Sequence, residues 1–304
     1  MLRWRLISAA VILAVLLTLI RLDYRNDLFP TAGGWLLPLL LIVSVLGTEE
    51  VLSLLRAKNL RPLEPIVYLG SVLVPLAAGA PIVAGMFGYE LAMPRSLGPC
   101  GAPLVAIALL TALAFIGEMT RYQRPGNSIA AAALAVFAIA YIGLLISFWA
   151  LLRLYHDNEW GMVALFSMLL VTKMADAGAF TFGKCFGRQK LTPVLSPGKT
   201  WEGAIGGILT ACVTSWLFFK FGARPMINGP YAAPPVFITV TYGALLAIAG
   251  LVGDLAESLL KRDMERKDSS TWLRGLGGVL DIIDSPLVAG PVAWLFWSLG
   301  FLGP

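Results

Sequence analysis

Apolar residues form nine stretches along the chain, and short polar or basic segments separate them. A helix needs about 20 mostly apolar residues to cross a bilayer, so each stretch predicts a membrane-spanning helix, although the first two are short. The third stretch contains Pro75 and Pro81, which are expected to kink the helix or divide it into two pieces. We therefore predict an all-α, polytopic membrane protein with about nine transmembrane helices, over residues 6–20, 34–46, 66–93, 101–117, 128–152, 160–182, 203–221, 236–253 and 279–302.

The composition supports a membrane protein and limits the chemistry. Of the 304 residues, 58% are hydrophobic and 13% are charged, whereas soluble domains carry about 25% charged residues. Three cysteines lie far apart, so we expect neither a disulfide framework nor a thiolate metal cluster. The single histidine, His156, excludes any mechanism that needs two histidines. Catalysis must therefore use carboxylates, lysines or a metal ion.

Lys and Arg residues are distributed unevenly between the two sides of the predicted helices. Sixteen fall on the side of the N-terminus, six fall on the other side, and Lys173 lies inside a span. Because cytoplasmic segments accumulate Lys and Arg, we predict a cytoplasmic N-terminus and a C-terminus on the opposite side. No transit peptide is recognised, which favours a bacterial inner membrane.

The charged residues divide the chain into two predicted regions. Residues 1–155 are expected to be a scaffold of lipid-facing helices, because they contain little polar sequence. Residues 156–304 are expected to be catalytic, with cytoplasmic loops at 183–202 and 254–278. These two loops hold nine of the sixteen basic residues on their side of the membrane.

Lys173 and Asp176 are charged residues inside a predicted span. Burying such a residue in a bilayer costs about 2.5–3.5 kcal/mol on insertion scales, so both need a partner or a function. At a spacing of three they share a helix face and could form a structural ion pair. Asp176 also lies near the predicted cytoplasmic end, where a hydrated site is possible.

The loop that follows resembles a phosphate-binding segment. It reads Ser196-Pro197-Gly198-Lys199-Thr200-Trp201-Glu202-Gly203 before the next helix. Hydroxyls, an ammonium group and backbone N–H groups at a helix N-terminus can all bind an anion. The glycine spacing of a Walker A motif is absent, since Pro193 occupies the first glycine position. An alternative is an anchor for lipid headgroups, which would explain the basic residues but not the whole string.

A third cluster begins at Asp254. In a helix, Asp254, Glu257, Ser258 and Lys261 share one face, as do Asp281 and Asp284 at the start of the last span. Carboxylates beside lysines suit a hard cation such as Mg²⁺ that bridges to substrate phosphates. The cluster therefore points to phosphoryl or nucleotidyl transfer. A polar network that holds the last helices together is the alternative.

These residues resemble the signature of the phosphatidate cytidylyltransferases, also called CDP-diacylglycerol synthases. That family has Ser, then Lys-Arg, then Lys-Asp, a Pro-Gly-His-Gly-Gly turn and Asp-Arg-x-Asp-Ser. The matching residues here are Ser258, Lys261-Arg262, Lys267-Asp268, Gly275, Gly277-Gly278, Asp281 and Asp284-Ser285. The strings from Asp176 to Phe180 and from Ser196 to Gly203 look like the family's two other motifs. The resemblance is close over 173–286 and extends to the first 150 residues only as apolar spans.

Three positions depart from the family pattern. The histidine of the turn is Leu276, its proline is Arg274, and the arginine after the first aspartate is Ile282. We hypothesise that Arg274 supplies the positive charge that Ile282 lacks.

The resemblance implies transfer of CMP from CTP to phosphatidic acid, giving CDP-diacylglycerol and pyrophosphate for phospholipid biosynthesis. It also implies a requirement for Mg²⁺, with a second, monovalent cation such as K⁺ nearby. Asp254 and Asp281 would hold Mg²⁺, converging at the inner leaflet. The expected catalytic residues are Asp254, Asp281, Lys199 and Lys261. The expected substrate-binding residues are Ser196, Thr200, Arg262, Lys267, Asp268, Asp176, Glu257 and Asp284.

Other functions remain open at this point. A CTP-dependent lipid-alcohol kinase would release CDP in place of pyrophosphate. A transporter could use the charges inside the spans, although no inverted repeat is visible. A degenerate family member would only bind lipid. The expected partners are CTP, phosphatidic acid, membrane lipid and a second copy in a homodimer, and no nucleic-acid-binding module is recognised.

Overall fold

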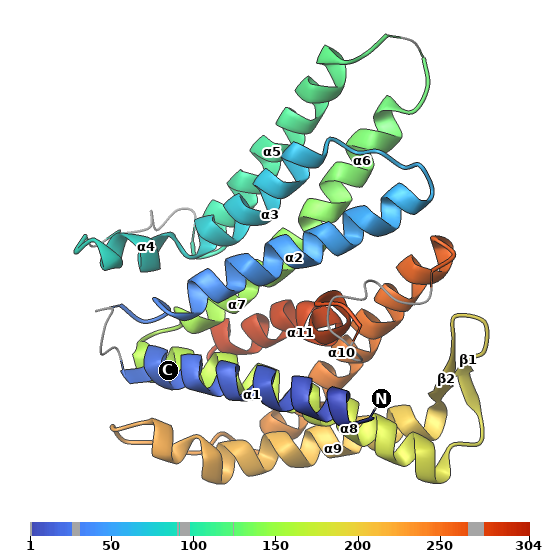
Figure 1. The fold of residues 1–304 in the computed structure, drawn as a ribbon. Coiled ribbons are helices and arrows are strands. Elements are labelled where there is room, and N and C mark those ends of the chain that lie inside the picture. Colours follow the sequence, from blue (N-terminus) through green and yellow to red (C-terminus); the bar gives the residue numbers. More distant parts are fainter. Residues whose placement is uncertain (1, 26–30, 90, 92–97, 124, 267–276) are drawn as a thin grey trace. The chain divides into compact units, whose positions relative to one another are not determined.

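The structure is a computed structural model that describes residues 2–25, 31–89, 91, 98–123, 125–266 and 277–304, with the backbone alone for 2–10 and 12. Within these ranges the regular elements are helices apart from one two-stranded hairpin, which confirms the predicted all-α class. The chain divides into two compact units. Figure 1 draws the helices and the hairpin, coloured from the N-terminus to the C-terminus. The first contains Met1–Leu154 and Met264–Ile282, and the second contains Tyr155–Asp263 and Ile283–Pro304.

The first unit is a set of helices connected by short segments. The helices are α1 (Leu2–Arg25), α2 (Leu36–Ala57), α3 (Glu64–Ala78), α4 (Ala80–Met86), α5 (Gly101–Thr120), α6 (Ser128–Ala138) and α7 (Leu145–Arg153). A π-helical stretch, Ile139–Leu144, joins α6 to α7, so these three elements form one continuous apolar span.

The predicted break in the third apolar stretch is confirmed. Helices α3 and α4 meet at Gly79 and are bent by 71° relative to each other. Pro75 lies in the last turns of α3, and Pro81 lies in the first turn of α4. Both prolines remove backbone N–H donors near the bend, which explains why one helix does not run through it.

Helix α2 is longer than predicted. The sequence pattern ended this span near residue 46, because Glu49, Glu50 and Arg56 follow, yet the helix continues to Ala57. Arg56 lies 2.8 Å from carboxylate oxygens of both Glu49 and Glu64, so one guanidinium group pairs with both acids. Because pairing lowers the cost of charged residues in the last turns, the helix can continue past Glu49.

A buried ion pair links distant parts of the first unit. The Arg153 guanidinium at the end of α7 donates to Asp23 of α1 over 2.6 Å, and both side chains are almost fully buried. Asp23 also accepts hydrogen bonds from the backbone N–H groups of Gly33, Trp35 and Leu36. A buried carboxylate with one cation and three N–H donors is well compensated.

The second unit contains the region expected to be catalytic. Its elements are α8 (Asn158–Phe186), β1 (Lys190–Thr192), β2 (Ser196–Thr200), α9 (Trp201–Leu217), a π-helical stretch (Phe218–Gly222), a 3₁₀ turn (Arg224–Met226), α10 (Val236–Asp263) and most of α11 (Leu280–Ser298). The strands pair antiparallel, with Lys190 opposite Thr200 and Thr192 opposite Ser196. The predicted loop 183–202 is therefore a helix end and a hairpin, and residues 254–263 of the predicted loop 254–278 are the last turns of α10.

Helices α8 and α10 pack side by side in the same direction. A Cβ atom on Gly250 of α10 would lie 3.1 Å from Thr172 Cγ2 of α8, and each residue is 14 positions after the start of its helix. Asp176 and Asp254 are each 18 positions after those starts, or about 27 Å along the axes. The two expected site residues therefore lie at the same end of this helix pair.

Aromatic side chains fill the core of the second unit. The Trp297 ring lies 5.9 Å from Phe219 and 6.2 Å from Trp160 at the start of α8. Tyr242 is fully buried, and its hydroxyl lies 2.9 Å from Ser167 Oγ. Large aromatic rings therefore fill the unit near the start of α8, whereas the expected site residues Asp176 and Asp254 lie toward the ends of α8 and α10.

Seven helices in the described part of the chain are long and apolar enough to cross a membrane, or eight if the bent pair α3 and α4 counts as one span. The predicted polytopic architecture is thus supported, whereas the predicted count of nine is not confirmed.

Candidate functional site

The last turns of α10 present acids and a lysine on one face, as the sequence spacing predicted. Asp254 and Glu257 are three positions apart, and Lys261 follows four positions after Glu257. Lys261 Nζ lies 2.9 Å from Glu257 Oε2. Side chains at these spacings stack along a helix, so the local sequence alone brings the three together.

Gly253 brings α11 against this face. A Cβ atom at Gly253 would lie 2.2 Å from the carbonyl oxygen of Asp284 and 3.2 Å from Ser285 Cα. Only a residue without a side chain permits so close an approach between two helices. The contact places Asp284 of α11 next to the acids of α10.

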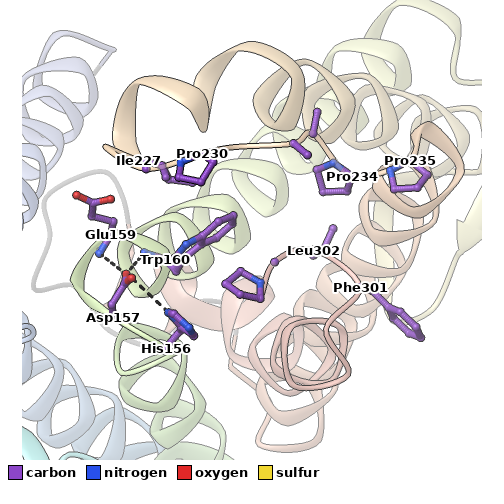
Figure 2. A pocket seen from close by; sticks show the side chains of 15 residues that line it. His156, Asp157, Glu159, Trp160, Ile227, Pro230, Pro234, Pro235, Phe301 and Leu302 are labelled. Atoms are coloured by element: carbon purple, nitrogen blue, oxygen red, sulfur yellow. Dashed lines mark hydrogen bonds and ion pairs between the residues drawn. The ribbon is translucent and has the colours of Figure 1, made fainter.

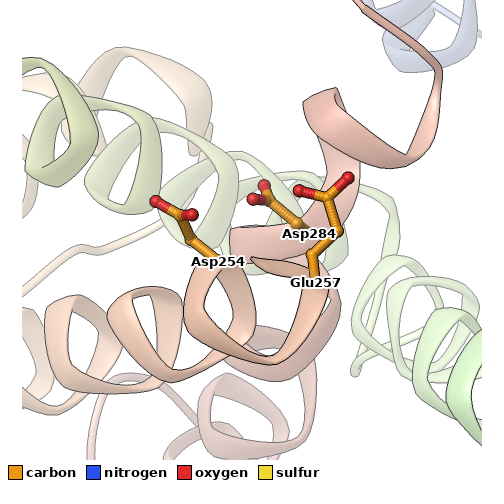
Figure 3. A group of neighbouring side chains, drawn as sticks. All are labelled: Asp254, Glu257 and Asp284. Atoms are coloured by element: carbon orange, nitrogen blue, oxygen red, sulfur yellow. The ribbon is translucent and has the colours of Figure 1, made fainter. Parts of the chain in front are cut away.

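Three carboxylates converge as a result. Oxygen atoms of Asp254, Glu257 and Asp284 all lie within 4.8 Å of one another (Figure 3). Glu257 and Asp284 are only 2% and 6% exposed, whereas Asp254 is half-buried and opens the group to solvent. We call these three residues the acid cluster.

Two lysines flank the acid cluster. Lys199, in β2, places its Nζ atom 2.8 Å from Asp254 Oδ2, and Lys261 pairs with Glu257. Both lysine side chains are largely buried, at 17% and 11% exposed. Ammonium groups held in this way are desolvated and interact more strongly with phosphates than exposed lysines do.

Asp176 of α8 is connected to the same helix end. Lys173 Nζ lies 3.1 Å from Asp176 Oδ2, so the predicted ion pair is formed. Ser285 Oγ donates to Asp176 Oδ1 over 3.2 Å, and the Ser285 N–H donates to Asp284 Oδ1 over 2.6 Å. Ser285 therefore links Asp176 to the acid cluster.

The hairpin is held by the residues of the Ser-Pro-Gly-Lys-Thr-Trp-Glu-Gly string. Thr200 is buried and caps α9, since its Oγ1 accepts from the Gly203 N–H over 3.1 Å. Glu202 accepts from the N–H groups of Arg188 and Gln189 at 3.0 and 3.2 Å. These bonds fix the hairpin to the first turn of α9. Lys199, in the second strand of the hairpin, points to Asp254.

The remaining predicted site residues are only partly brought together. Ser196 lies at the start of β2, and Arg262 donates from Nε to the Leu195 carbonyl over 3.4 Å. Asp281 belongs to the first unit and Asp254 to the second, so their convergence stays a prediction. Lys267, Asp268, Arg274 and Leu276 lie outside the described residues.

The acid cluster fits a hard divalent cation. Its donors are carboxylate oxygens, the ligand type that Mg²⁺ prefers. In their ionised forms the three carboxylates carry more charge than the two lysines offset, and uncompensated buried charge is costly. An additional cation would supply the missing compensation.

A cavity of about 610 Å³ lies elsewhere in the second unit, near the start of α8 (Figure 2). His156, Asp157, Trp160 and Phe301 are among the residues that line it. Asp157 caps α8 by accepting from the N–H groups of Glu159 and Trp160, so its charge has a structural role. The cavity is distinct from the acid cluster, which lies about 27 Å further along the helices.

Three residues have larger roles in the site than the sequence predicted. Glu257 and Asp284 were expected to bind substrate, yet their carboxylates lie within 4.8 Å of that of Asp254 and complete the acid cluster. Gly253 was given no role, although an isolated glycine inside a helical pattern can mark close packing. Spacing along one helix predicted that Asp254 and Glu257 share a face. No sequence pattern could predict that Asp284 of α11 lies close to them.

Comparisons with known proteins agree with this chemistry. Residues 3–299 match the Cytidylyltransferase family. A phosphatidate cytidylyltransferase of Haemophilus influenzae is 39% identical over 142 residues, which is 47% of this chain and 48% of that protein. The chloroplastic phosphatidate cytidylyltransferase 4 of Arabidopsis thaliana is 32% identical over 87% of this chain and 68% of its own length. A phosphatidate cytidylyltransferase of Chlamydia pneumoniae is 29% identical over 96% of this chain and 91% of its own length.

The family match covers nearly the whole chain, and it includes the acid cluster and both flanking lysines. The matched relatives are bacterial and plant proteins that share one enzyme name. The chain therefore belongs to the cytidylyltransferase family of nucleotidyltransferases.

Proposed function

We propose that this chain transfers CMP from CTP to phosphatidic acid and releases CDP-diacylglycerol and pyrophosphate. The observation that carries the proposal is the acid cluster flanked by two largely buried lysines at one end of α8 and α10. The family match and the shared name of the matched relatives support it.

Asp254, Glu257 and Asp284 are the residues proposed to hold Mg²⁺. When bound, the cation neutralises charge on the triphosphate and orients it. Asp281 is proposed as a further ligand, because it lies one turn before Asp284 on α11. A second, monovalent cation such as K⁺ remains a prediction from the family resemblance.

The lysines act on the phosphates of CTP. A phosphate oxygen of phosphatidic acid attacks the α-phosphorus of CTP, and the bond between the α-phosphorus and the bridging oxygen to the β-phosphorus breaks. Pyrophosphate leaves with the bonding electrons, and Lys199 and Lys261 offset its charge. The attacking phosphate monoester is already ionised at neutral pH, so no general base is required.

The other predicted residues are assigned to the substrates and to the positioning of the acids. Ser196, Thr200 and Arg262 bind phosphate groups from the hairpin and from the end of α10. Asp176 orients Ser285 and through it Asp284. Lys267 and Asp268, at their predicted positions after α10, bind CTP or the lipid headgroup.

The helix lengths suit a reaction at a membrane surface. Helices α8 and α10 have 29 and 28 residues, more than the roughly 20 that cross the hydrocarbon core, so their last turns reach the polar layer. There the headgroup of phosphatidic acid meets water-soluble CTP, while the acyl chains stay in the bilayer. We propose a bacterial inner membrane with the site facing the cytoplasm, and a homodimer.

The test is transfer of label from CTP by purified protein in detergent with phosphatidic acid. The proposal expects label from the α-phosphate in the lipid fraction, an equal amount of pyrophosphate, and a requirement for Mg²⁺. Asp254→Asn should abolish both products, whereas Asp263→Asn should not, because Asp263 is exposed at the end of the same helix. Lipid labelled from the γ-phosphate would indicate a lipid kinase, and no turnover would favour a transporter or a lipid-binding protein.

A further inference from the structure

Two carboxylates bind the backbone at the start of α11. The Gly278 N–H donates to Asp281 Oδ2 over 2.7 Å. The next two N–H groups, of Val279 and Leu280, donate to Glu50 Oε1 and Oε2, each over 2.8 Å. Three successive N–H groups are therefore held by side chains, and all of these residues belong to the first unit.

Glu50 is an uncommon capping residue. Helix N-termini are usually capped by a Ser, Thr, Asp or Asn adjacent in sequence, whereas Glu50 lies on α2, 229 positions before Val279. Its carboxylate is only 5% exposed. Placing a buried charge there is favourable only because the N–H groups and the positive end of α11 compensate for it.

Glycines leave the space that both carboxylates need. A Cβ atom on Gly278 would lie 2.2 Å from Glu50 Oε2. Gly277 has a φ angle of +86°, and a Cβ atom there would lie 2.4 Å from Asp281 Oδ2. Larger residues at positions 277 and 278 would therefore displace the carboxylates of Asp281 and Glu50.

We infer that Glu50 is a positioning residue for the transfer reaction, acting through the first turn of α11. That turn carries Asp281, whose Oδ2 atom accepts from the Gly278 N–H. The next N–H group, of Val279, donates to Glu50. Asp284 of the acid cluster follows one turn later on the same helix. The inference rests on the proposed function, because it assigns Glu50 to the support of a cation-binding turn.

The chain provides a matched control in the neighbouring residue. Glu49 is also on α2, but its partners are the Arg56 guanidinium and the hydroxyl of Tyr68. Substituting Glu49 removes the same charge from the same helix without touching α11. A general weakening of α2 would therefore appear in both variants, and a positioning effect only in the Glu50 variant.

The experiment compares Glu50→Gln, Glu50→Asp and Glu49→Gln with the wild type in detergent. A glutamine keeps one acceptor oxygen but turns an NH₂ group toward one of the two N–H donors. We expect Glu50→Gln to weaken binding of Mn²⁺, measured by electron paramagnetic resonance without CTP, by about 10-fold or more. We also expect faster amide exchange in residues 277–285 and a matching rise in the Mg²⁺ concentration for half-maximal CMP transfer. Glu50→Asp should recover part of each effect, and Glu49→Gln should show none.

Gly278→Ala tests the same contact without changing a charge, and decides the question if Glu50→Gln does not fold. Its Cβ atom would displace the Glu50 carboxylate, so it should reproduce the loss of Mn²⁺ affinity. Wild-type Mn²⁺ affinity in both Glu50→Gln and Gly278→Ala, or an equal loss in Glu49→Gln, would overturn the inference. If the wild type formed no CDP-diacylglycerol, the proposed function would fail, while the Mn²⁺ comparison would still report on Glu50.

Discussion

Lys199 Nζ lies 2.8 Å from Asp254 Oδ2 and thereby joins the hairpin before α9 to the acid cluster on α10. The lysine follows a glycine in a strand whose next residue, Thr200, caps α9. Its position is therefore fixed by backbone structure on both sides. This ammonium group compensates the charge of Asp254, and we expect a cation held by Asp254 to release it toward the phosphates of CTP.

Lys199→Met should separate these two roles. Without the ammonium group, CMP transfer should fall by about 10²–10³-fold, because charge on the departing pyrophosphate is no longer offset. Mn²⁺ binding should not weaken, since a competitor for Asp254 is gone. Steady-state rates and Mn²⁺ titrations measure both quantities, with the exposed Lys190→Met as control. A parallel loss of cation affinity would contradict the proposed exchange.

Gly253→Ala should force α10 and α11 apart. The added methyl group would lie 2.2 Å from a backbone carbonyl, which cannot move aside as a side chain could. We expect a loss of about 1–3 kcal/mol in the free energy of unfolding, together with loss of activity. Thermal unfolding in detergent provides the measurement. Gly229→Ala is the control, since a Cβ atom at Gly229 meets nothing within 4 Å; equal stability of the two variants would refute the close contact.

Arg153→Met should destabilise the first unit. The substitution leaves Asp23 buried without its cation, which typically costs about 3–5 kcal/mol when one partner of a buried pair is removed. The three N–H donors to Asp23 should reduce this cost. We expect a lower unfolding temperature with unchanged Mn²⁺ affinity of the folded fraction. A variant as stable as the wild type would show that the pair contributes nothing.

Tyr231 should make stability sensitive to alkaline pH. The residue lies between α9 and α10, outside the predicted spans, and burial raises the pKa of its phenol to about 12. Its hydroxyl donates to the Phe219 carbonyl. Because the folded-state pKa exceeds the unfolded value of 10.0, this stabilisation is complete below pH 10 and is lost between about pH 10 and 12.

The Tyr231→Phe variant isolates that contribution. Unfolding temperatures of wild type and variant should converge as the pH rises from 9 to 12. Over this range only the wild type loses the stabilisation that its protonated phenol provides. A difference between the two proteins that stays constant over this range would argue against the raised pKa.

Patterns along single elements were predictable from the sequence. Apolar stretches gave the helical class and most spans, because hydrophobic length is a local property. Spacing gave the shared face of Asp254, Glu257 and Lys261, and prolines gave the break between α3 and α4. The resemblance to a family added the substrates.

Contacts between elements were not predictable. The sequence ended the second span before Glu49 and Glu50, because acids inside a helix of a membrane protein are costly unless paired. Their partners are Arg56 on the same helix and backbone N–H groups near residue 279, and the second kind leaves no sequence pattern. The same limit applies to the approach of Asp284 to Gly253.

Direct titration of Mn²⁺ into the purified protein, followed by electron paramagnetic resonance, tests the acid cluster most directly. Wild type and Asp263→Asn should bind Mn²⁺ with the same affinity. Glu257→Gln should bind at least about 10-fold more weakly and should transfer CMP correspondingly more slowly. A folded Glu257→Gln variant that binds Mn²⁺ as tightly as the wild type would contradict a cation held by Asp254, Glu257 and Asp284.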